Sequence, residues 1–367
     1  MIVGLGSCGI AAGAAATYRK IEELCLAEKI DIELGKTSCV GMCYREPLVE
    51  VVDEDGSYLY GEVDEKRAIE IVEKHLRQHS PVKEYIVQTD LFATEDDSFT
   101  RNQVKIALRN CGYMDPENID QYEAREGYLA VKGIASKGTS RAEVIQTVLE
   151  SGLRGRGGGG FPTGMKWKFA SNYSSAEKYI ICNADEGDPG AFMDRSVLEG
   201  DPHSVLEGMI IGGYAIGASE GVIYCRAEYP LAIKRLEIAL TQAREKGYLG
   251  ANACGIQGFN FDIHIKEGAG AFVCGEETAL IASVEGRRGM PRKRPPFPAE
   301  SGLWNKPTNI NNVETFANIP WILNNGAAAY AAFGTEKSKG TKVFALAGKV
   351  KRSGLVEIGR ASCRERV

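Results

Sequence analysis

Apolar residues in the first 80 positions follow two different spacings, and these predict alternating strands and helices. Three apolar runs predict strands, at residues 1–5, 48–53 and 57–63. Two longer segments carry the helical spacing, at residues 11–28 and 64–79. Pro81 and its polar neighbours then interrupt the pattern, which indicates a linker. The sequence therefore predicts a small α/β domain over residues 1–78.

A larger α/β domain is expected over residues 79–335, because helical and strand-like segments keep alternating there. Ser140 followed by Glu143 is typical of a capping box at the start of a helix. Further strands are predicted at residues 178–183, 221–225 and 261–265, with a helix at 230–246. Residues 341–356 have the pattern of a first hairpin in a third domain, which we place at residues 336–357.

Charge and cysteine content narrow the class of protein. The net charge of -5 gives no basic patch of the kind that nucleic acids require, so we expect small molecules or proteins as partners. No apolar run approaches the roughly 20 residues of a membrane-spanning helix. The uncharged residues 1–17 allow a signal peptide or a buried strand and helix start, and their glycines favour the second. Ten cysteines without the spacing of a small secreted scaffold favour a cytoplasmic location.

A glycine-rich loop at residues 152–167 is the strongest local signal. It reads GLRGRGGGGFPTGMKW, in which seven of sixteen residues are glycine and cations lie towards both ends. Such a loop lets backbone amides approach a phosphate, with Arg156 and Lys166 adding positive charge. A plain flexible turn is the alternative. The loop follows a predicted helix rather than a strand, so it does not meet the context of a Rossmann fingerprint.

Two further segments carry polar residues in patterns that suggest a ligand site. Residues 182–192, CNADEGDPGAF, follow an apolar strand directly, where open α/β sheets collect ligand contacts. Residues 268–280 contain the pair Glu276 and Glu277 and are followed by PRKRPPFP at 291–298 and NINNVET at 309–315. Each segment taken by itself has an alternative explanation. The first is also explained by an acidic turn, and the second by the start of a helix whose dipole is complemented by carboxylates.

Together the three segments resemble those of the NADH-oxidising flavoprotein subunit of respiratory complex I. The resemblance is closest to the diaphorase-type subunit of NAD(P)-linked iron hydrogenases, and it covers about residues 80–356. It implies a thioredoxin-like, ferredoxin-type unit at 1–78, an FMN- and NADH-binding α/β domain at 79–335, and the start of a ubiquitin-like β-grasp domain of the SLBB type at 336–357.

The resemblance also implies a set of cofactor-binding residues. The FMN phosphate would be held by Gly155, Arg156, Gly157, Gly158 and Lys166. The flavin and its ribityl chain would contact Asn183, Asp185, Glu186, Gly275, Glu276, Asn311, Asn312 and Thr315. NADH would contact Phe161, Phe169, Asp188, Glu277, Arg294 and Phe297. Phe272, Asp188 and Arg294 depart from the residues usual in complex I, so the choice between NADH and NADPH stays open.

By the same resemblance, hydride passes from NAD(P)H to FMN, and electrons continue to iron-sulfur subunits of a larger complex. No acid-base residue is required for this transfer, so we expect no catalytic side chain. The alternatives are a non-catalytic assembly subunit without flavin, and a related subunit that reduces a different partner.

Three cysteines near the N-terminus resemble part of an iron-sulfur site. Cys8, Cys39 and Cys43 match three of the four thiolates that hold a 2Fe-2S cluster in thioredoxin-like ferredoxins. The fourth would fall near Val3, where no cysteine stands, and Cys25 lies in a predicted helix. The cluster is therefore intact, vestigial or lost by truncation.

The C-terminus lacks a motif that the resemblance implies. A 4Fe-4S cluster of the family is held by a C-x-x-C-x-x-C motif and a distant cysteine, and no C-x-x-C occurs in this sequence. We therefore expect that cluster in a C-terminal part that the chain does not include. Residues 358–367 read as a non-native tail, so we exclude them from the fold prediction.

Overall fold

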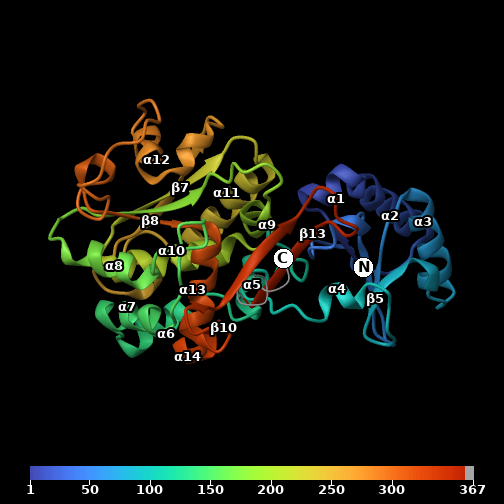
Figure 1. The fold of residues 1–367 in the computed structure, drawn as a ribbon. Helices are drawn as coiled ribbons and strands as arrows, with labels where there is room; N and C mark the ends of the chain where they lie inside the picture. The colour runs from blue at the N-terminus through green and yellow to red at the C-terminus, as the bar shows by residue number, and fades with distance from the viewer. Residues whose placement is uncertain (360–367) are drawn as a thin grey trace. The chain divides into compact units, whose positions relative to one another are not determined.

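The computed structural model describes residues 1–359, whose contacts group them into two compact units (Figure 1). Unit 1 comprises Met1–Gln103, Asn110–Asp115 and Phe344–Val356. Unit 2 comprises Val104–Arg109, Pro116–Val343 and the residues from Glu357 onward. The final strand runs to Gly359, and the rest of the expected tail, residues 360–367, lies outside the described residues.

Unit 1 contains a five-stranded mixed sheet with the order β2-β1-β3-β4-β5. Its strands are β1 (Ile2–Gly4), β2 (Gly35–Thr37), β3 (Val49–Val52), β4 (Ser57–Tyr60) and β5 (Ile86–Thr89). β1 pairs with β2 in parallel, and the other pairs are antiparallel. Its helices are α1 (Ser7–Ala12), α2 (Ala14–Glu28), α3 (Glu65–Ile71) and α4 (Asp97–Thr100). Short 3-10 turns lie at Cys43–Arg45 and Lys83–Tyr85.

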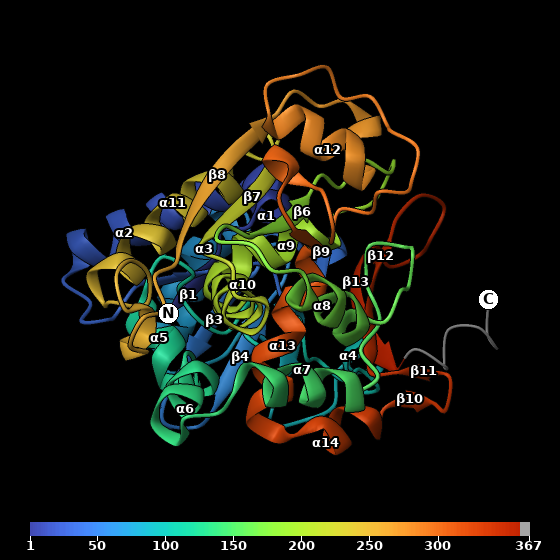
Figure 2. The same cartoon turned by 90° about the vertical axis from the view of Figure 1, so that its left-hand side faces the viewer.

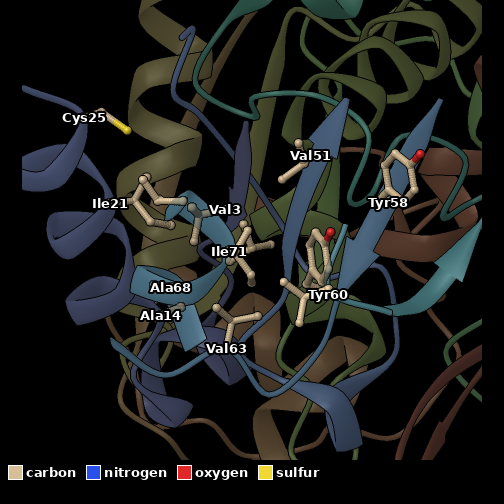
Figure 3. Packing of buried hydrophobic residues seen from close by; sticks show 13 residues of the cluster. Val3, Ala14, Ile21, Cys25, Val51, Tyr58, Tyr60, Val63, Ala68 and Ile71 are labelled. Carbon is tan, nitrogen blue, oxygen red and sulfur yellow. The ribbon is translucent and has the colours of Figure 1, made fainter. Parts of the chain in front are cut away.

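The core of unit 1 forms where α2 and α3 pack on the sheet (Figure 3). Helix α2 buries positions three or four residues apart, namely Ala14, Thr17, Ile21 and Cys25, because these fall on one helical face. The sheet contributes Val3 and Tyr60, both fully buried. The helix predicted at residues 64–79 is only partly α-helical, since α3 ends at Ile71 and Val72–Arg77 continue as a π-helix.

Unit 2 is built on a four-stranded parallel sheet with the order β8-β7-β6-β9. These strands are β6 (Tyr179–Ala184), β7 (Glu220–Arg226), β8 (Asp262–Gly268) and β9 (Thr308–Asn312). β6 is central, and in register Asn183 stands beside Asn312 of β9. Since all four strands run the same way, their carboxyl ends meet at one edge of the sheet. Three of them match the strands predicted at 178–183, 221–225 and 261–265.

Helices cover both faces of this sheet (Figures 1 and 2). The helices are α5 (Ile119–Ala124), α6 (Leu129–Lys137), α7 (Arg141–Glu150), α8 (Thr163–Asn172), α9 (Met193–Gly200), α10 (Pro202–Ile216), α11 (Pro230–Glu245), α12 (Glu277–Val284), α13 (Val313–Asn325) and α14 (Ala327–Ala331). Three 3-10 turns lie at Ala253–Gly255, Phe272–Gly275 and Leu303–Asn305. Both views place α12 on one face and α10 with α13 on the other. Leu280 of α12 and Ile181 of β6 accordingly belong to one hydrophobic cluster, whereas Ile180, the neighbour of Ile181, faces Gly212 of α10.

Short elements complete the chain. A two-stranded sheet joins β10 (Gly334–Thr335) to β11 (Ser338–Lys339), and another joins β12 (Thr341–Leu346) to β13 (Gly354–Gly359). The second pair matches the hairpin predicted at residues 341–356. The predicted capping box is present, because Ser140 and Glu143 exchange hydrogen bonds at the start of α7. No helix among residues 1–359 has the length and apolar character needed to cross a membrane.

Candidate functional site

A cavity of about 760 Å³ lies in unit 2 at the carboxyl ends of β6 and β9. From β6 the chain continues to β7 on one side, whereas β9 lies on the other side. Open α/β sheets bind ligands at this kind of switch in strand order. The volume falls within the range of roughly 300–1,000 Å³ that is usual for small-molecule sites. The residues lining it are Gly155, Gly157, Gly159, Gly160, Phe161, Lys166, Phe169, Asn172, Tyr173, Asn183, Gly275, Glu277, Arg294, Phe297, Pro298, Ala299, Ile310, Asn311 and Asn312.

The glycine loop forms one wall of the cavity. It joins the end of α7 to the start of α8, so the prediction that it follows a helix is confirmed. The loop closes on itself where Gly155 N donates to Phe161 O at 2.9 Å. A Cβ atom added at Gly157 would lie 3.0 Å from the Cβ of Asn312, so a larger residue here would have to displace Asn312 or the loop by a few tenths of an ångström. The wall is therefore mostly backbone, with little side chain between its amides and the cavity.

Arg156 lies within this loop, but its guanidinium is bound elsewhere. The residue is only 3% exposed. Its guanidinium donates to Thr341 O, Arg154 O, Tyr330 Oη and Lys339 O at 2.7–3.0 Å. Its backbone N donates to Thr315 Oγ1 at 2.9 Å. The side chain thus anchors the loop to neighbouring segments and is absent from the cavity lining.

Three charged residues face one another on the cavity wall. Glu277 accepts from Lys166 Nζ at 2.9 Å and from Arg294 at 2.6 Å. Burial alone would raise the pKa of the Glu277 carboxyl, but Lys166 and Arg294 outweigh burial and hold this pKa below its usual value. Glu277 is therefore a carboxylate at neutral pH, and the group of three carries one net positive charge.

The strand ends contribute amide and carboxyl groups. Asn183, at the end of β6, donates to Gly275 O at 2.9 Å and accepts from Asp185 N at 3.1 Å. Asn311 of β9 accepts from Trp167 Nε1 at 2.9 Å. The buried Oδ2 of Asp185 has no hydrogen-bond partner among the described residues, and burial raises the pKa of this carboxyl. A buried acceptor without a partner is costly, so a ligand donor at this place would be favourable.

Asn312 links the cavity to a buried acidic residue behind it. Asn312 Nδ2 donates to Asp194 Oδ2 at 2.5 Å, and its Oδ1 accepts from Thr315 N at 3.3 Å. Burial, followed by the nearby charges of Glu186 and Glu314, raises the pKa of Asp194 well above its ordinary value. Sequence reasoning did not single out Asp194, because nothing in its local pattern separates it from other helical acids.

Several of the predicted residues are near the cavity without lining it. Glu276 caps α12 through Thr278 N and Ala279 N, and Glu186 accepts from Asp194 N and Arg195 N. Thr315 is fully buried and Asp188 is exposed. The predicted residues outside the lining are Arg156, Gly158, Asp185, Glu186, Asp188, Glu276 and Thr315. Several of these residues position the cavity wall, since Asp185 N and Thr315 N donate to the lining residues Asn183 and Asn312.

Aromatic rings form the outer part of the cavity. Phe161, Phe169 and Phe297 are 51%, 44% and 56% exposed, although each lines the cavity. Exposed rings at a cavity mouth offer flat apolar faces for stacking. The lining residues that sequence analysis missed are Gly159, Gly160, Asn172, Tyr173, Pro298, Ala299 and Ile310. All of them lie within four residues of a predicted one, so a wider window around each motif finds them.

The three predicted cysteine ligands come together in unit 1. The Sγ atoms of Cys8, Cys39 and Cys43 lie within 4.8 Å of one another, and those of Cys39 and Cys43 are 3.7 Å apart. Hydrogen bonds from the thiols of Cys39 and Cys43 lower the pKa of Cys8 to about 3. Cys8 is therefore available as a thiolate, the form that binds metal ions. Among residues 1–359 these are the cysteines grouped closely enough to share a metal.

Known proteins resemble both the cavity region and the chain as a whole. Residues 148–321 match the family model described as the Nuo51 FMN-binding domain of the complex I 51K type. The NADP-reducing hydrogenase subunit HndC of Solidesulfovibrio fructosivorans is 62% identical over 259 residues, which are 70% of this chain and 52% of the relative. The mitochondrial NADH dehydrogenase (ubiquinone) flavoprotein 1 of Dictyostelium discoideum is 42% identical over 286 residues, covering 73% of this chain and 59% of the relative.

A solved structure extends the likeness to nearly the whole chain. The crystal structure of an NAD+-reducing NiFe-hydrogenase in the H2-reduced state has 32% identity and a TM-score of 0.59. The match covers 97% of this chain and 58% of that one. The chain thus spans just over half the length of the curated relatives it matches.

Proposed function

We propose that this chain, which belongs through residues 148–321 to the family of Nuo51 FMN-binding domains, oxidises NADH with the help of FMN and delivers electrons to iron-sulfur centres of a larger complex. One observation carries the proposal. The cavity combines a glycine wall, amide groups at strand ends and exposed aromatic rings in a single volume of about 760 Å³.

The inner half of the cavity suits FMN. Backbone amides of Gly157 and Gly158 would bind the phosphate, with the ammonium of Lys166 adding charge. Gly155 would shape this loop, since its own N donates to Phe161 O. Arg156 contributes to this site by anchoring the loop, since its guanidinium is bound to four acceptors of the protein. When bound, FMN accepts a hydride and can release electrons singly.

The polar groups at the strand ends fit the flavin and its ribityl chain. The unpartnered Oδ2 of Asp185 can accept from a ligand donor, and Gly275 leaves space beside it, since an added Cβ would be 3.9 Å from this atom. The residues proposed to contact or support the flavin are Asn183, Asp185, Glu186, Gly275, Glu276, Asn311, Asn312 and Thr315.

The outer half suits a nicotinamide nucleotide. Phe161, Phe169 and Phe297 would stack on the adenine or nicotinamide rings. Glu277 would accept hydrogen bonds from the nucleotide, and Arg294 would balance its charge. We propose NADH as the nucleotide, although the names of the relatives divide between NADH and NADP. No side chain needs to move a proton for hydride transfer, so the residues act by binding and orienting the rings.

The finer organisation of the chain is also proposed. We assign residues 1–78 to a thioredoxin-like domain, 79–335 to the FMN- and NADH-binding domain, and 336–357 to the start of a β-grasp domain of the SLBB type. The proposed partners are iron-sulfur subunits of a complex of the hydrogenase or complex I type, and a 4Fe-4S cluster would lie in a further C-terminal part. A cytoplasmic location stays a prediction.

Flavin binding by the purified 367-residue chain tests the proposal. Quenching of FMN fluorescence should show saturable uptake, and anaerobic NADH should bleach the absorbance of the bound flavin. Lys166→Ala should weaken FMN binding about tenfold, because one charge-assisted hydrogen bond is worth about 1.5 kcal/mol.

Lys168→Ala is the matched control. Lys168 lies on the same helix but is exposed and outside the cavity lining, so this variant should bind FMN like the wild type. A folded wild-type chain that takes up no FMN would favour the scaffold alternative and overturn the proposal.

A further inference from the structure

The cysteine group of unit 1 has three sulfur ligands, whereas an iron-sulfur cluster of the 2Fe-2S type needs four protein ligands. Cys39 and Cys43 come from the segment between β2 and β3, and Cys8 lies at the start of α1. A fourth ligand from this chain would have to be another side chain close to these sulfurs. This question does not depend on the flavin cavity of unit 2.

A carboxyl group stands beside the cysteines. Glu46 follows the 3-10 turn Cys43–Arg45, and its Oε1 lies 3.3 Å from the Sγ of Cys8. Its other oxygen, Oε2, accepts from Leu48 N at 3.1 Å. One oxygen is thus held by the backbone, and the other is turned towards the sulfur cluster. Carboxylate oxygen is an established metal ligand in proteins.

The space around Glu46 depends on one glycine of α1. A Cβ added at Gly9 would lie 2.9 Å from Glu46 Oε2 and 2.5 Å from Gly4 O, so a larger residue there would force a shift of the Glu46 side chain or of the backbone. At Gly4 an added Cβ would lie 3.7 Å from the same oxygen, which is an ordinary contact. Gly9 is therefore the position that leaves room for the Glu46 side chain beside the cysteines.

The two other positions at which a fourth ligand was considered lie in the hydrophobic core of unit 1. Val3 and Cys25 belong to the hydrophobic core between α2 and the sheet, together with Ile21 and Ile71 (Figure 3). Cys25 is buried at only 7% exposure among apolar neighbours. Val3, at the position where the family resemblance expects a cysteine, is thus used for packing. Cys25, the remaining cysteine of residues 1–78, is used for packing as well.

We propose that Glu46 is the fourth ligand of an iron-sulfur cluster in unit 1. The three sulfurs lie within 4.8 Å of one another, Cys39 and Cys43 are adjacent in this group at 3.7 Å, and Glu46 approaches Cys8 at 3.3 Å. Cys39 and Cys43 would hold one iron, and Cys8 with Glu46 would hold the other, which would then have a carboxylate oxygen among its ligands. Gly41 N donates to Cys39 Sγ at 3.2 Å, a contact of the kind that tunes cluster potentials.

Mössbauer spectroscopy of the full chain, reconstituted anaerobically with iron-57 and sulfide, tests this ligand set. The wild type should bind two irons and two sulfides and show two doublets of equal area, one for a sulfur-only iron and one for an iron with oxygen ligation. Glu46→Gln keeps the size of the side chain but cannot supply a carboxylate ligand to iron, so this variant should lose most of the iron and sulfide.

Two variants serve as matched controls. Glu50→Gln removes a carboxylate that binds Ser57 in the same unit, and Cys25→Ala removes a cysteine outside the group. Both should keep the cluster and its spectrum. Two identical sulfur-only doublets in the wild type, an unchanged spectrum in Glu46→Gln, or uptake of one zinc without sulfide would each overturn the proposal. FMN content measured on the same samples separates a failure here from a failure of the flavin assignment.

Discussion

The cavity of unit 2, where we propose that flavin binds, and the cysteine group of unit 1 are two ways of building a binding site. The cavity is lined by nineteen residues drawn from loops, strand ends and helices, and much of one wall is backbone. The cysteine group relies on three sulfurs and, by our proposal, one carboxylate. The first site distributes many weak contacts over a large surface, whereas the second concentrates a few strong bonds on one point.

This difference determines how each site should respond to substitution. Loss of one contact in the cavity leaves the others in place, so binding should weaken by a graded amount. Loss of one metal ligand leaves an incomplete coordination shell, so binding should be all or none. The predictions below test this contrast, beginning with the largest effect.

Removal of Cys39, the most buried of the three clustered cysteines, should abolish metal binding altogether. Cys39 is 6% exposed, and its sulfur also accepts from Gly41 N, so no water or neighbouring ligand can replace it easily. We expect Cys39→Ala to contain no stoichiometric iron after reconstitution, while its FMN affinity stays at the wild-type value. Iron and sulfide analysis beside an FMN titration checks both parts, and Cys25→Ala is the control. Retention of half the iron would contradict the all-or-none contrast.

Acid should destabilise unit 2 through a buried histidine. Burial lowers the pKa of His203 to about 4 from 6.5, and the ring contacts Tyr128 Oη at 2.9 Å and Gln242 Oε1 at 3.1 Å. The pKa of His203 is lower in the folded protein than in the unfolded chain. The free energy of unfolding therefore has its full value above pH 6.5 and decreases as the pH falls towards 4. The shift corresponds to about 3 kcal/mol at full effect.

Thermal unfolding measured at several pH values between 7 and 4, with flavin release as the signal, reports this loss of stability. His203→Gln should flatten the pH profile of the melting temperature, whereas His79→Gln, a change at an exposed histidine of unit 1, should leave it unchanged. An equal pH slope in His203→Gln and the wild type would assign the acid sensitivity to another group.

Gly157→Val should weaken FMN binding by a smaller, graded amount. Its Cβ would crowd Asn312 at 3.0 Å, so we expect the loop to shift and carry its amides away from the phosphate. Overpacking of this kind costs about 2 kcal/mol, which is roughly a 30-fold rise in Kd. The control is Gly133→Val, because nothing lies within 4 Å of the Cβ position at Gly133. A Kd within threefold of the wild type would show that the loop tolerates displacement.

The same contrast explains which parts could be predicted from the sequence. The glycine loop, Asn183 at the end of β6 and the capping box at Ser140 depend on neighbours a few residues away, so local patterns predict them. Cys8, Cys39 and Cys43 were also predicted to belong to one metal site, and their sulfur atoms lie within 4.8 Å of one another. The α/β class of the fold follows from the spacing of apolar residues, whereas the parallel sheet of unit 2 and the mixed sheet of unit 1 are found only in the structure.

Other features depend on contacts between distant segments, which the local pattern does not contain. Arg156 was expected at the phosphate, but its guanidinium binds Lys339 and Thr341, more than 180 residues along the chain. Glu46 is one of many acids in the sequence, and only its approach to Cys8 distinguishes it. Asp185 likewise gains its interest from an unpartnered oxygen rather than from its motif.

The smallest effect is expected for Asp188, which we place near the nucleotide. A carboxylate close to the adenosine ribose favours NADH, because it accepts hydroxyl hydrogen bonds and repels a 2'-phosphate. Asp188, however, is exposed and outside the cavity lining, whereas Glu277 lines the cavity and is held between Lys166 and Arg294. Exposed charges are screened by water and salt, and their pair energies are about 0.5 kcal/mol.

Asp188→Asn should therefore change the ratio of kcat/KM for NADH and NADPH by only about twofold. Diaphorase assays with an artificial one-electron acceptor at low and high salt measure this ratio, and the change should shrink as salt rises. A salt-independent change of tenfold or more would mean that Asp188 closes onto the nucleotide when it binds, and would make it a principal determinant of nucleotide choice.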